Sequence, residues 1–403
     1  METLSETRSA VSDLREMTLG DLEQVVAEAG EAPYRARQIM NWLWRHNASS
    51  ADVMHEIPAR LRQHLKQYFR ISRLATSHVA RAADGTCKLL LRLDDGLEIE
   101  SVIIPAGERT TLCISSQAGC AMACEFCATA RMGLRRNLAA GEILGQIVIA
   151  RTMLGGALPD NREARLRGPG TAKSAAANNS STHTMPRGAI NGDSVALGHS
   201  EGLTNYVFMG MGEPLANYSR LSRALTIMTA DWGLSLSPRR ITVSTVGLTP
   251  MMERLLNDFP VNLAVSLHAT TDQLRDRLAP INRRYPLQEL METCRQLPLN
   301  RRSRITFEYV MLDRVNDSPE DARRLLRMLA PLRAKVNLIF FNPFAEAPFR
   351  PSPRARVEAF QAILLQGNLT ATIRESRGQD IAAACGQLFA ERRTGSPNQE
   401  VLS

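Results

Sequence analysis

The fold of this chain is decided by a nine-residue stretch, Gly119-Cys120-Ala121-Met122-Ala123-Cys124-Glu125-Phe126-Cys127. Its three thiols are separated by three and then by two residues. Thiolates this close on a short loop bind soft metal centres, and iron–sulfur clusters are held in this way. Three protein ligands leave one iron of a four-iron cluster open to a further molecule. The spacing therefore predicts a 4Fe–4S cluster on Cys120, Cys124 and Cys127.

Two other interpretations of the three thiols are weaker. A tetrahedral zinc site needs four ligands, and the loop itself holds no fourth Cys or His. Three reduced thiols could also pack in a core as small apolar side chains. Free cysteines rarely gather in a loop that is otherwise rich in Gly and small residues, so a cluster is the favoured interpretation.

The composition indicates a protein with a large core and a basic surface. With 403 residues the chain is long enough for two or three domains, and its net charge of +8 and pI of about 9.4 suit a polyanionic partner. Seven cysteines, an odd number, argue against a disulfide scaffold and for a reducing compartment. Residues 1–16 lack an apolar signal core, and no run approaches the roughly eighteen apolar residues of a membrane span. We therefore expect a cytoplasmic protein with no membrane partner.

Residues 1–76 are expected to form a small helical domain. Thr18 and Asp21 make a capping-box pattern ahead of apolar residues at helical spacing. The segment from Tyr34 to Arg45 also has a helical pattern, and it carries several Arg residues and two Trp. These side chains could bind nucleic acid by charge and stacking, although core aromatics beneath a solvated basic face are the commoner outcome of such a pattern.

Residues 77–108 change to the alternating pattern of strands. Asp84-Gly85 and Asp95-Gly96 separate the alternating stretches, and both dipeptides are typical of hairpin turns. A β-meander is therefore expected to link the helical domain to the rest of the chain.

Residues 109–391 alternate strands with helices. The expected strands are 111–116, 205–209, 241–244, 262–266, 305–311 and 336–341, and the expected helices include 140–153, 218–231, 287–297, 319–329 and 354–365. Six β–α units imply an α/β fold with a parallel sheet, here a partial (β/α)6 TIM-like barrel to which the helical domain and the β-hairpin extension are attached. Polar and Gly-rich residues follow the strands directly, so one shared site is expected at the carboxyl ends of the strands.

Two segments fall outside this pattern. Residues 155–201 lack hydrophobic periodicity and are rich in Ala, Asn, Ser, Gly and Arg, so we expect a disordered surface insertion. Residues 392–403 are expected to form a flexible tail.

Two further motifs extend the interpretation of the cysteine loop. The stretch Gly210-Met211-Gly212-Glu213-Pro214 follows the second strand; its glycines let a ligand approach the backbone, and its carboxylate can accept hydrogen bonds from an ammonium group. Near the end of the chain, residues 374–388 place Cys385 among Ala and Gly.

These motifs together resemble one family, the dual-specificity RNA (adenine carbon-2) methyltransferases of the radical S-adenosylmethionine (SAM) superfamily. The resemblance runs from about Leu14 to Leu388 and fails only across the insertion. Besides the three motifs, it includes residues 33–38, 98–101, 111–117 and 304–312.

The resemblance implies a mechanism that uses two SAM molecules. The first methylates Cys385, and the second binds the open iron and is cleaved to a 5′-deoxyadenosyl radical. That radical takes a hydrogen atom from the Cys385 methyl group, and the resulting methylene radical adds to carbon 2 of adenine. Cys113 then forms a disulfide with Cys385, which releases the methylated base. In the family, the residue at the position of Glu100 is the one that removes the carbon-2 proton. Cys113 is a competing candidate for this role.

The resemblance also implies ligands and partners. The residues expected to contact SAM are Gly212, Glu213, Ser244, Ser266, Leu267, His268 and Asn342. The implied substrates are 23S rRNA, at the peptidyl transferase centre, and tRNA, at the adenosine next to the anticodon, with residues 1–76 helping to bind them. A reducing protein such as a flavodoxin would supply electrons, and the chain would act as a monomer.

Three other functions compete with this one. A sister enzyme methylates carbon 8 of the same ribosomal adenosine, and it shares the cluster and both reactive cysteines. Methylation of carbon 2 is favoured because the sequence around Cys120 and Cys385 resembles the carbon-2 enzymes more closely than the carbon-8 enzyme. An activating enzyme that generates glycyl radicals, or an RNA-binding protein with a structural cluster, would not need the pair Cys113 and Cys385.

Overall fold

The computed structural model of the protein describes residues 12–155, 202–300, 303–344 and 347–389. The expected insertion, apart from Gly155, and the expected tail lie outside these residues. Within the described part of the chain, no helix has the length and apolar character needed to cross a bilayer.

The protein is built around one open sheet of ten strands in the order β14-β13-β12-β11-β10-β9-β6-β5-β4-β3. Neighbouring strands are parallel from β6 to β14 and antiparallel from β3 to β6. The strands are β3 (Ala75–Arg81), β4 (Cys87–Arg92), β5 (Glu98–Ala106), β6 (Arg109–Cys113), β9 (Asn205–Phe208), β10 (Ile241–Thr245), β11 (Asn262–Ser266), β12 (Ile305–Met311), β13 (Ala334–Phe340) and β14 (Ala371–Arg374). The expected meander is therefore part of the same sheet as the parallel strands.

The six strands expected from the sequence are all present, with ends that differ by a few residues. All seven residues of β12 are buried, which is typical of a central parallel strand covered on both faces. The structure adds a seventh parallel strand, β14, which pairs with β13. β14 is absent from the expected strands, and it is defined by its long-range pairing with β13 at the edge of the sheet.

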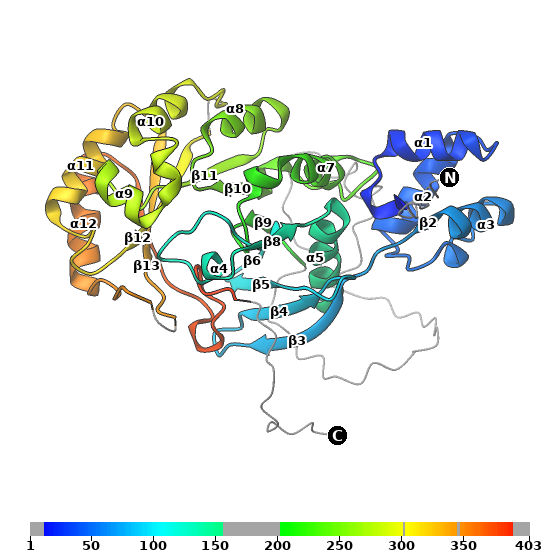
Figure 1. Ribbon diagram of the computed structural model, residues 1–403, viewed down its shortest axis with the longest axis horizontal. Helices are drawn as coiled ribbons and strands as arrows, with labels where there is room; N and C mark the ends of the chain where they lie inside the picture. Colours follow the sequence, from blue (N-terminus) through cyan, green and yellow to red (C-terminus); the bar gives the residue numbers. More distant parts are fainter. Residues whose placement is uncertain (1–11, 156–201, 301–302, 345–346, 390–403) are drawn as a thin grey trace, which may run out of the picture.

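Helices cover the outer side of the parallel strands, and α8 to α12 follow one another along it (Figure 1). The helices of this part are α5 (Ala140–Met153), α7 (Tyr218–Thr229), α8 (Thr249–Asp258), α9 (Asp272–Leu278), α10 (Leu287–Gln296), α11 (Pro319–Leu329) and α12 (Arg354–Gln366). Short 3₁₀ helices are η3 (Pro214–Asn217), η4 (Pro238–Arg240), η5 (Pro280–Arg283) and η6 (Gln379–Ile381). One continuous cluster of buried apolar side chains joins these helices to the sheet, and each fully buried Leu, Ile or Phe contributes roughly 1.5–3 kcal/mol.

The first part of the chain forms a separate helical unit beside α5 and α7 (Figure 1). It consists of β1 (Ser12–Asp13), η1 (Leu14–Glu16), α1 (Leu19–Glu28), α2 (Tyr34–Trp44), η2 (Ala51–Val53), α3 (Ala59–Tyr68) and β2 (Phe69–Arg70). The capping box expected at Thr18 and Asp21 is present at the start of α1. Trp44 is fully buried beneath Arg15, so this aromatic belongs to the core. Glu16 joins the unit to the rest of the protein by accepting a hydrogen bond from the Gly141 backbone and by pairing with Arg220.

Candidate active site

A pocket of about 980 Å³, counted to its open mouth, lies at the carboxyl ends of the parallel strands. Residues at or just after the ends of β9, β10, β11 and β13 face into it, as expected for an α/β fold of this kind. The expected site residues that line it are Cys120, Cys124, Cys127, Gly212, Glu213, Ser244, Ser266, His268, Asn342 and Cys385. Three expected residues do not line it, namely Leu267, Cys113 and Glu100.

The cluster loop, residues 119–127, lies between β7 (Gln117–Gly119) and α4 (Ala128–Arg131). β7 pairs with β8 (Leu134–Asn137) in a separate two-stranded sheet. Gly119 has a φ of 77°, and a Cβ at this position would stand 1.8 Å from the carbonyl oxygen of Gly133, so only glycine fits. Ala123 also adopts a positive φ of 54°, which is an uncommon conformation for a residue with a side chain and typical of a functional loop.

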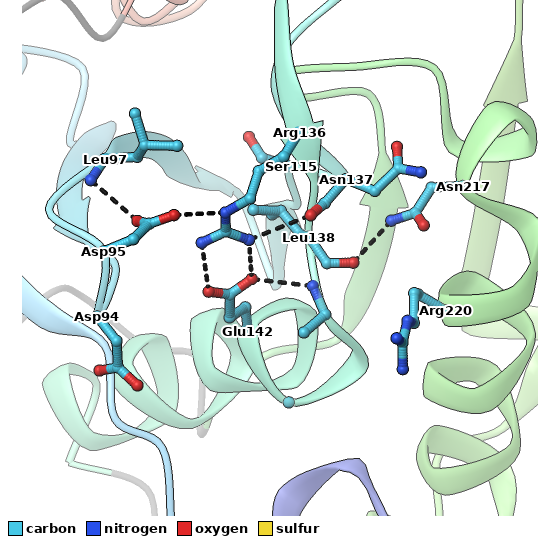
Figure 2. A network of polar contacts seen from close by, with 12 residues as sticks. Asp94, Asp95, Leu97, Ser115, Arg136, Asn137, Leu138, Glu142, Asn217 and Arg220 are labelled. Atoms are coloured by element: carbon cyan, nitrogen blue, oxygen red, sulfur yellow. Dashed lines mark hydrogen bonds and ion pairs between the residues drawn. The ribbon is translucent and has the colours of Figure 1, made fainter. Parts of the chain in front are cut away.

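Arg136 of β8 ties the cluster loop's hairpin to two other elements (Figure 2). Its guanidinium donates two hydrogen bonds of 2.7 and 2.8 Å to the Glu142 carboxylate at the start of α5. It also donates one of 2.5 Å to Asp95, in the turn between β4 and β5. Glu142 in turn accepts a hydrogen bond from the Ala139 backbone, which caps α5. The two carboxylates raise the pKa of Arg136, so this link stays charged at any physiological pH.

The electrostatics of the three thiols fit a metal cluster. Burial, followed by repulsion from the charges of Cys127 and Cys120, raises the pKa of Cys124 well above its usual value. Burial, with repulsion from Cys127 and Glu213, raises the pKa of Cys120 to about 12. Bound cations deprotonate such thiols and remove their mutual repulsion. In the described residues no three Cys, His, Asp or Glu side chains converge on one metal ion; a four-iron cluster does not need this, because each thiolate binds a different iron.

The Gly210–Pro214 stretch forms the side of the pocket next to the cluster loop. A Cβ on Gly212, whose φ is 97°, would stand 2.5 Å from the Gln117 Cβ, so the two segments touch only because this residue is glycine. The Glu213 carboxylate accepts hydrogen bonds from the backbone N–H groups of Leu215 (3.1 Å) and Val246 (2.9 Å). Burial raises the pKa of Glu213 to about 7. A ligand ammonium group would favour the ionised carboxylate and could occupy its remaining lone pairs.

His268 and Leu267 both follow β11, but only the His268 side chain lines the pocket. The His268 ring faces the pocket, packs edge-on against Phe126 at 4.3 Å, and accepts a hydrogen bond at Nδ1 from the Val310 backbone. Burial and the charge of Arg275 lower the pKa of His268 to about 3, so the ring is neutral and Nε2 carries its proton. Leu267 is fully buried outside the pocket, and its carbonyl accepts a hydrogen bond from Arg275.

Cys385 lies on a loop that closes the pocket from the C-terminal end of the described chain; the Cys385 loop is defined here as residues 378–389. Cys385 lines the pocket and is partly exposed as a residue, while the protein packed around its thiol raises its pKa to about 12, first by removing water and then through the charges of Cys113, Glu308 and Cys127. Cys113, at the end of β6, is buried, and burial raises its pKa to about 12. All seven cysteines are free, so the expected disulfide between Cys113 and Cys385 is absent from this structure.

Glu100, on β5, is 4% exposed and lies behind the Cys385 loop. Its carboxylate pairs with Lys88 at 2.9 Å and accepts a hydrogen bond of 2.9 Å from the Phe389 backbone N–H. Both carboxylate oxygens therefore have partners within the protein. Glu100 is therefore bonded to the Cys385 loop through Phe389, but it does not line the pocket.

Sequence reasoning missed one charged residue of the pocket, Glu308. It lies in the middle of β12, is 6% exposed, and accepts a hydrogen bond of 2.8 Å from the Asn337 amide. Burial raises its pKa. A single carboxylate inside an apolar strand was the signal that could have found it, because a buried charge needs a partner or a function.

Comparisons with known proteins identify the family of this chain. Residues 12–71 match the family model described as the ribosomal RNA large subunit methyltransferase N-terminal domain, and residues 192–326 match that of the radical SAM superfamily. A relative named dual-specificity RNA methyltransferase RlmN, from Anaeromyxobacter dehalogenans (strain 2CP-C), is 44% identical over 394 residues, which cover 97% of this chain and 95% of the relative. Another of the same name, from Pelobacter propionicus (strain DSM 2379 / NBRC 103807 / OttBd1), is 45% identical over 378 residues, covering 94% and 95%.

A solved structure gives the same result for the fold. The crystal structure of a radical SAM methyltransferase from Sphaerobacter thermophilus superimposes with a TM-score of 0.78 at 42% identity, covering 94% of this chain and all of that one. The expected family and the α/β radical SAM fold are thereby confirmed. The chain belongs to the RlmN family of dual-specificity RNA methyltransferases, in the radical SAM superfamily.

Proposed function

We propose that this protein methylates carbon 2 of adenosine in 23S rRNA, at the peptidyl transferase centre, and in tRNA, next to the anticodon, with Cys385 as the methyl carrier. The observation that carries the proposal is the placement of Cys385 in one pocket with Cys120, Cys124 and Cys127. Adenine carbon 2 is an electrophilic carbon, so direct polar transfer of a methyl cation from SAM is unfavourable, and a carrier on the protein provides another route.

Different residues of the pocket would bind the cluster and SAM. Cys120, Cys124 and Cys127 would hold a 4Fe–4S cluster, and Glu213, Ser244, Ser266, His268 and Asn342, with the backbone at Gly212 and Leu267, would hold SAM. When bound, the cluster and SAM supply the one-electron chemistry that activates the methyl group. We also propose that the parallel strands curve as a partial barrel, because residues from five of them reach this one pocket.

The two remaining thiols would act in sequence. The Cys385 sulfur takes the methyl group, loses its proton and later carries that carbon to adenine. For release, the Cys113 sulfur bonds to the Cys385 sulfur, the bond from that sulfur to the methyl carbon breaks, and the electron pair leaves with the carbon, which then takes a proton. Cys113 or Glu100 would accept the carbon-2 proton. A protein reductant such as a flavodoxin would supply electrons to the cluster, and a thiol reductant would reopen the disulfide.

The RNA must present an adenine outside its stack, which costs a few kcal/mol and favours loops and single strands. The basic chain and the helical unit at residues 12–71 suit such a partner, because Lys and Arg side chains bind phosphates. We propose that the chain acts on RNA as a monomer.

The test is product analysis. Reconstituted protein with SAM, a reductant and unmodified rRNA fragments or tRNA should yield 2-methyladenosine by mass spectrometry of nucleosides. Cys385→Ala should yield none, whereas Cys294→Ala, a buried cysteine of α10 outside the pocket, should retain activity. Finding 8-methyladenosine, or no methylated adenosine from the wild-type protein, would contradict the proposal.

A further inference from the structure

The Cys385 loop is held by side chains that lie about three hundred residues earlier in the chain. Lys88 on β4 and Glu100 on β5 are diagonal neighbours on one face of the sheet, because Lys88 pairs with Val102 and Glu100 with Leu90. Their side chains are only 15% and 5% exposed, and the Lys88 Nζ lies 2.9 Å from the Glu100 Oε1. An ion pair this sheltered is far less screened by water than a surface pair.

Each member of this pair also binds the Cys385 loop. The Lys88 ammonium donates a hydrogen bond of 3.1 Å to the carbonyl oxygen of Ala382. The other Glu100 oxygen accepts a hydrogen bond of 2.9 Å from the backbone N–H of Phe389. The pair therefore holds the loop at one point before Cys385 and at one point after it.

The loop needs such support because part of its backbone is strained. Ala382 has a φ of 50°, which costs energy for a residue with a side chain, and it is the residue whose carbonyl Lys88 holds. The neighbouring hairpin turn adds two hydrogen bonds, from Gly378 N–H to Asp84 (3.1 Å) and from Ala83 N–H to Asp380 (3.0 Å). Strained conformations persist only where the surrounding structure determines them in this way.

We propose that Lys88 and Glu100 are positioning residues that hold the Cys385 sulfur at the pocket, and that they act through Ala382 and Phe389. The inference rests on the proposed function, in which Cys385 carries the methyl group. It predicts that both residues are needed for the first methyl transfer, onto Cys385 itself. A residue that only accepts the carbon-2 proton of RNA is not needed at that step, so the order of events separates the two roles.

The experiment measures methylation of Cys385 in the absence of RNA. Protein is produced without its cluster so that Cys385 is unmethylated, then reconstituted with iron and sulfide and given SAM and reductant. The methyl content of the Cys385 peptide is followed over time by mass spectrometry. Lys88→Met should slow this reaction about 10- to 100-fold, since a displacement of about 1 Å at a reacting atom has effects of that size. Lys88→Arg, which keeps a charged donor, should restore most of the rate.

Two further variants make the result specific. Glu100→Gln keeps an acceptor for Phe389 but loses the charge that holds Lys88, so it should also slow Cys385 methylation. Lys66→Met removes an exposed lysine that pairs with Asp52 in the helical unit, and it should leave the rate unchanged. Iron content and the melting temperature show that each variant is folded, and faster trypsin cleavage after Arg377 in Lys88→Met would report release of the loop.

The outcomes are distinct. Wild-type rates of Cys385 methylation in both Lys88→Met and Glu100→Gln would overturn the inference. Normal Cys385 methylation with a block only after RNA is added would do the same, and would give Glu100 the role of proton acceptor. A wild-type protein that never methylates Cys385 would instead contradict the proposed function.

Discussion

The two loops that meet at the pocket, the cluster loop and the Cys385 loop, are built in different ways. The cluster loop has hydrogen bonds between near neighbours, such as Cys127 N–H to the Cys124 carbonyl (3.2 Å) and Cys120 N–H to the Gly133 carbonyl (3.1 Å). Glu125 adds long-range contacts, with the Leu278 carbonyl (3.2 Å) and Arg277 (3.0 Å). The Cys385 loop has partners 259 to 297 positions away, including Thr129, Lys88 and Ala83. The proposed cluster ligands thus lie in a loop with many contacts between near neighbours, whereas the proposed methyl carrier lies in a loop that is also held at several points by the folded sheet.

The largest effect expected from this comparison comes from the cluster loop. Cys124→Ala should lose iron and sulfide and should reduce methylation of RNA below detection, because the local ligand set is incomplete. The Cys385 loop should remain in place, since its contacts with Lys88, Ala83 and Thr129 do not involve Cys124, and its resistance to trypsin should equal that of the wild type. A Cys124→Ala protein that keeps its cluster and its activity would break the comparison.

The next effect concerns Cys113, the proposed partner of Cys385 in product release. Cys113→Ala should still methylate Cys385 and attack RNA, but it cannot form the disulfide that releases the product. RNA should therefore accumulate in covalent attachment to Cys385, visible as a slow band in denaturing gels that protease digestion removes. Multiple turnover without such an adduct would show that release does not depend on Cys113.

A smaller effect is expected at Glu213, between the two loops. Glu213→Gln keeps the size of the side chain and removes the charge available to a ligand ammonium group. A charge-assisted hydrogen bond of this kind contributes about 1.5–3 kcal/mol, so the Kd for SAM should rise about 10- to 100-fold. The change in Kd is measured by equilibrium binding of SAM to the reconstituted protein. Ser222→Ala, a change on the outer helix α7, serves as the control. An unchanged Kd would remove Glu213 from the SAM site.

The smallest effect tests whether distant contacts also matter for the cluster loop. Arg136→Gln removes the charged link from β8 to Asp95 and Glu142. Because the three side chains are partly exposed, the loss should be about 1 kcal/mol and should lower the melting temperature by only a few degrees. Cluster content should stay at the wild-type level. A large loss of iron would show that the cluster loop, too, depends on the fold for its shape.

The same contrast explains what could be predicted from the sequence. The alternation of strands and helices, the hairpin turns and the three-thiol spacing are local patterns, and the structure contains the corresponding elements. α5 and α11, for example, begin and end at the predicted residues 140–153 and 319–329. The four-residue β14 and the joining of the meander to the parallel sheet depend on long-range pairing, which no local pattern carries.

The site shows the same limit. Cys120, Cys124 and Cys127 follow from their spacing, and the resemblance to a family pointed to Cys385 and Glu213. The pairing of Lys88 with Glu100 and the presence of Glu308 in the pocket follow only from the register of the strands. The resemblance implies a SAM contact at Leu267, whose side chain is fully buried outside the pocket, so the proposed contact is through its backbone.

The central claim, that the methyl group passes through Cys385, is tested most directly by tracing it. Protein expressed with an unlabelled methyl group on Cys385 is mixed with unmodified RNA, reductant and SAM that carries a deuterated methyl group. The 2-methyladenosine from the first turnover should be unlabelled, and deuterium should enter only in later turnovers. Deuterated methyl in the first product would mean that the group comes straight from the added SAM, and it would contradict the account.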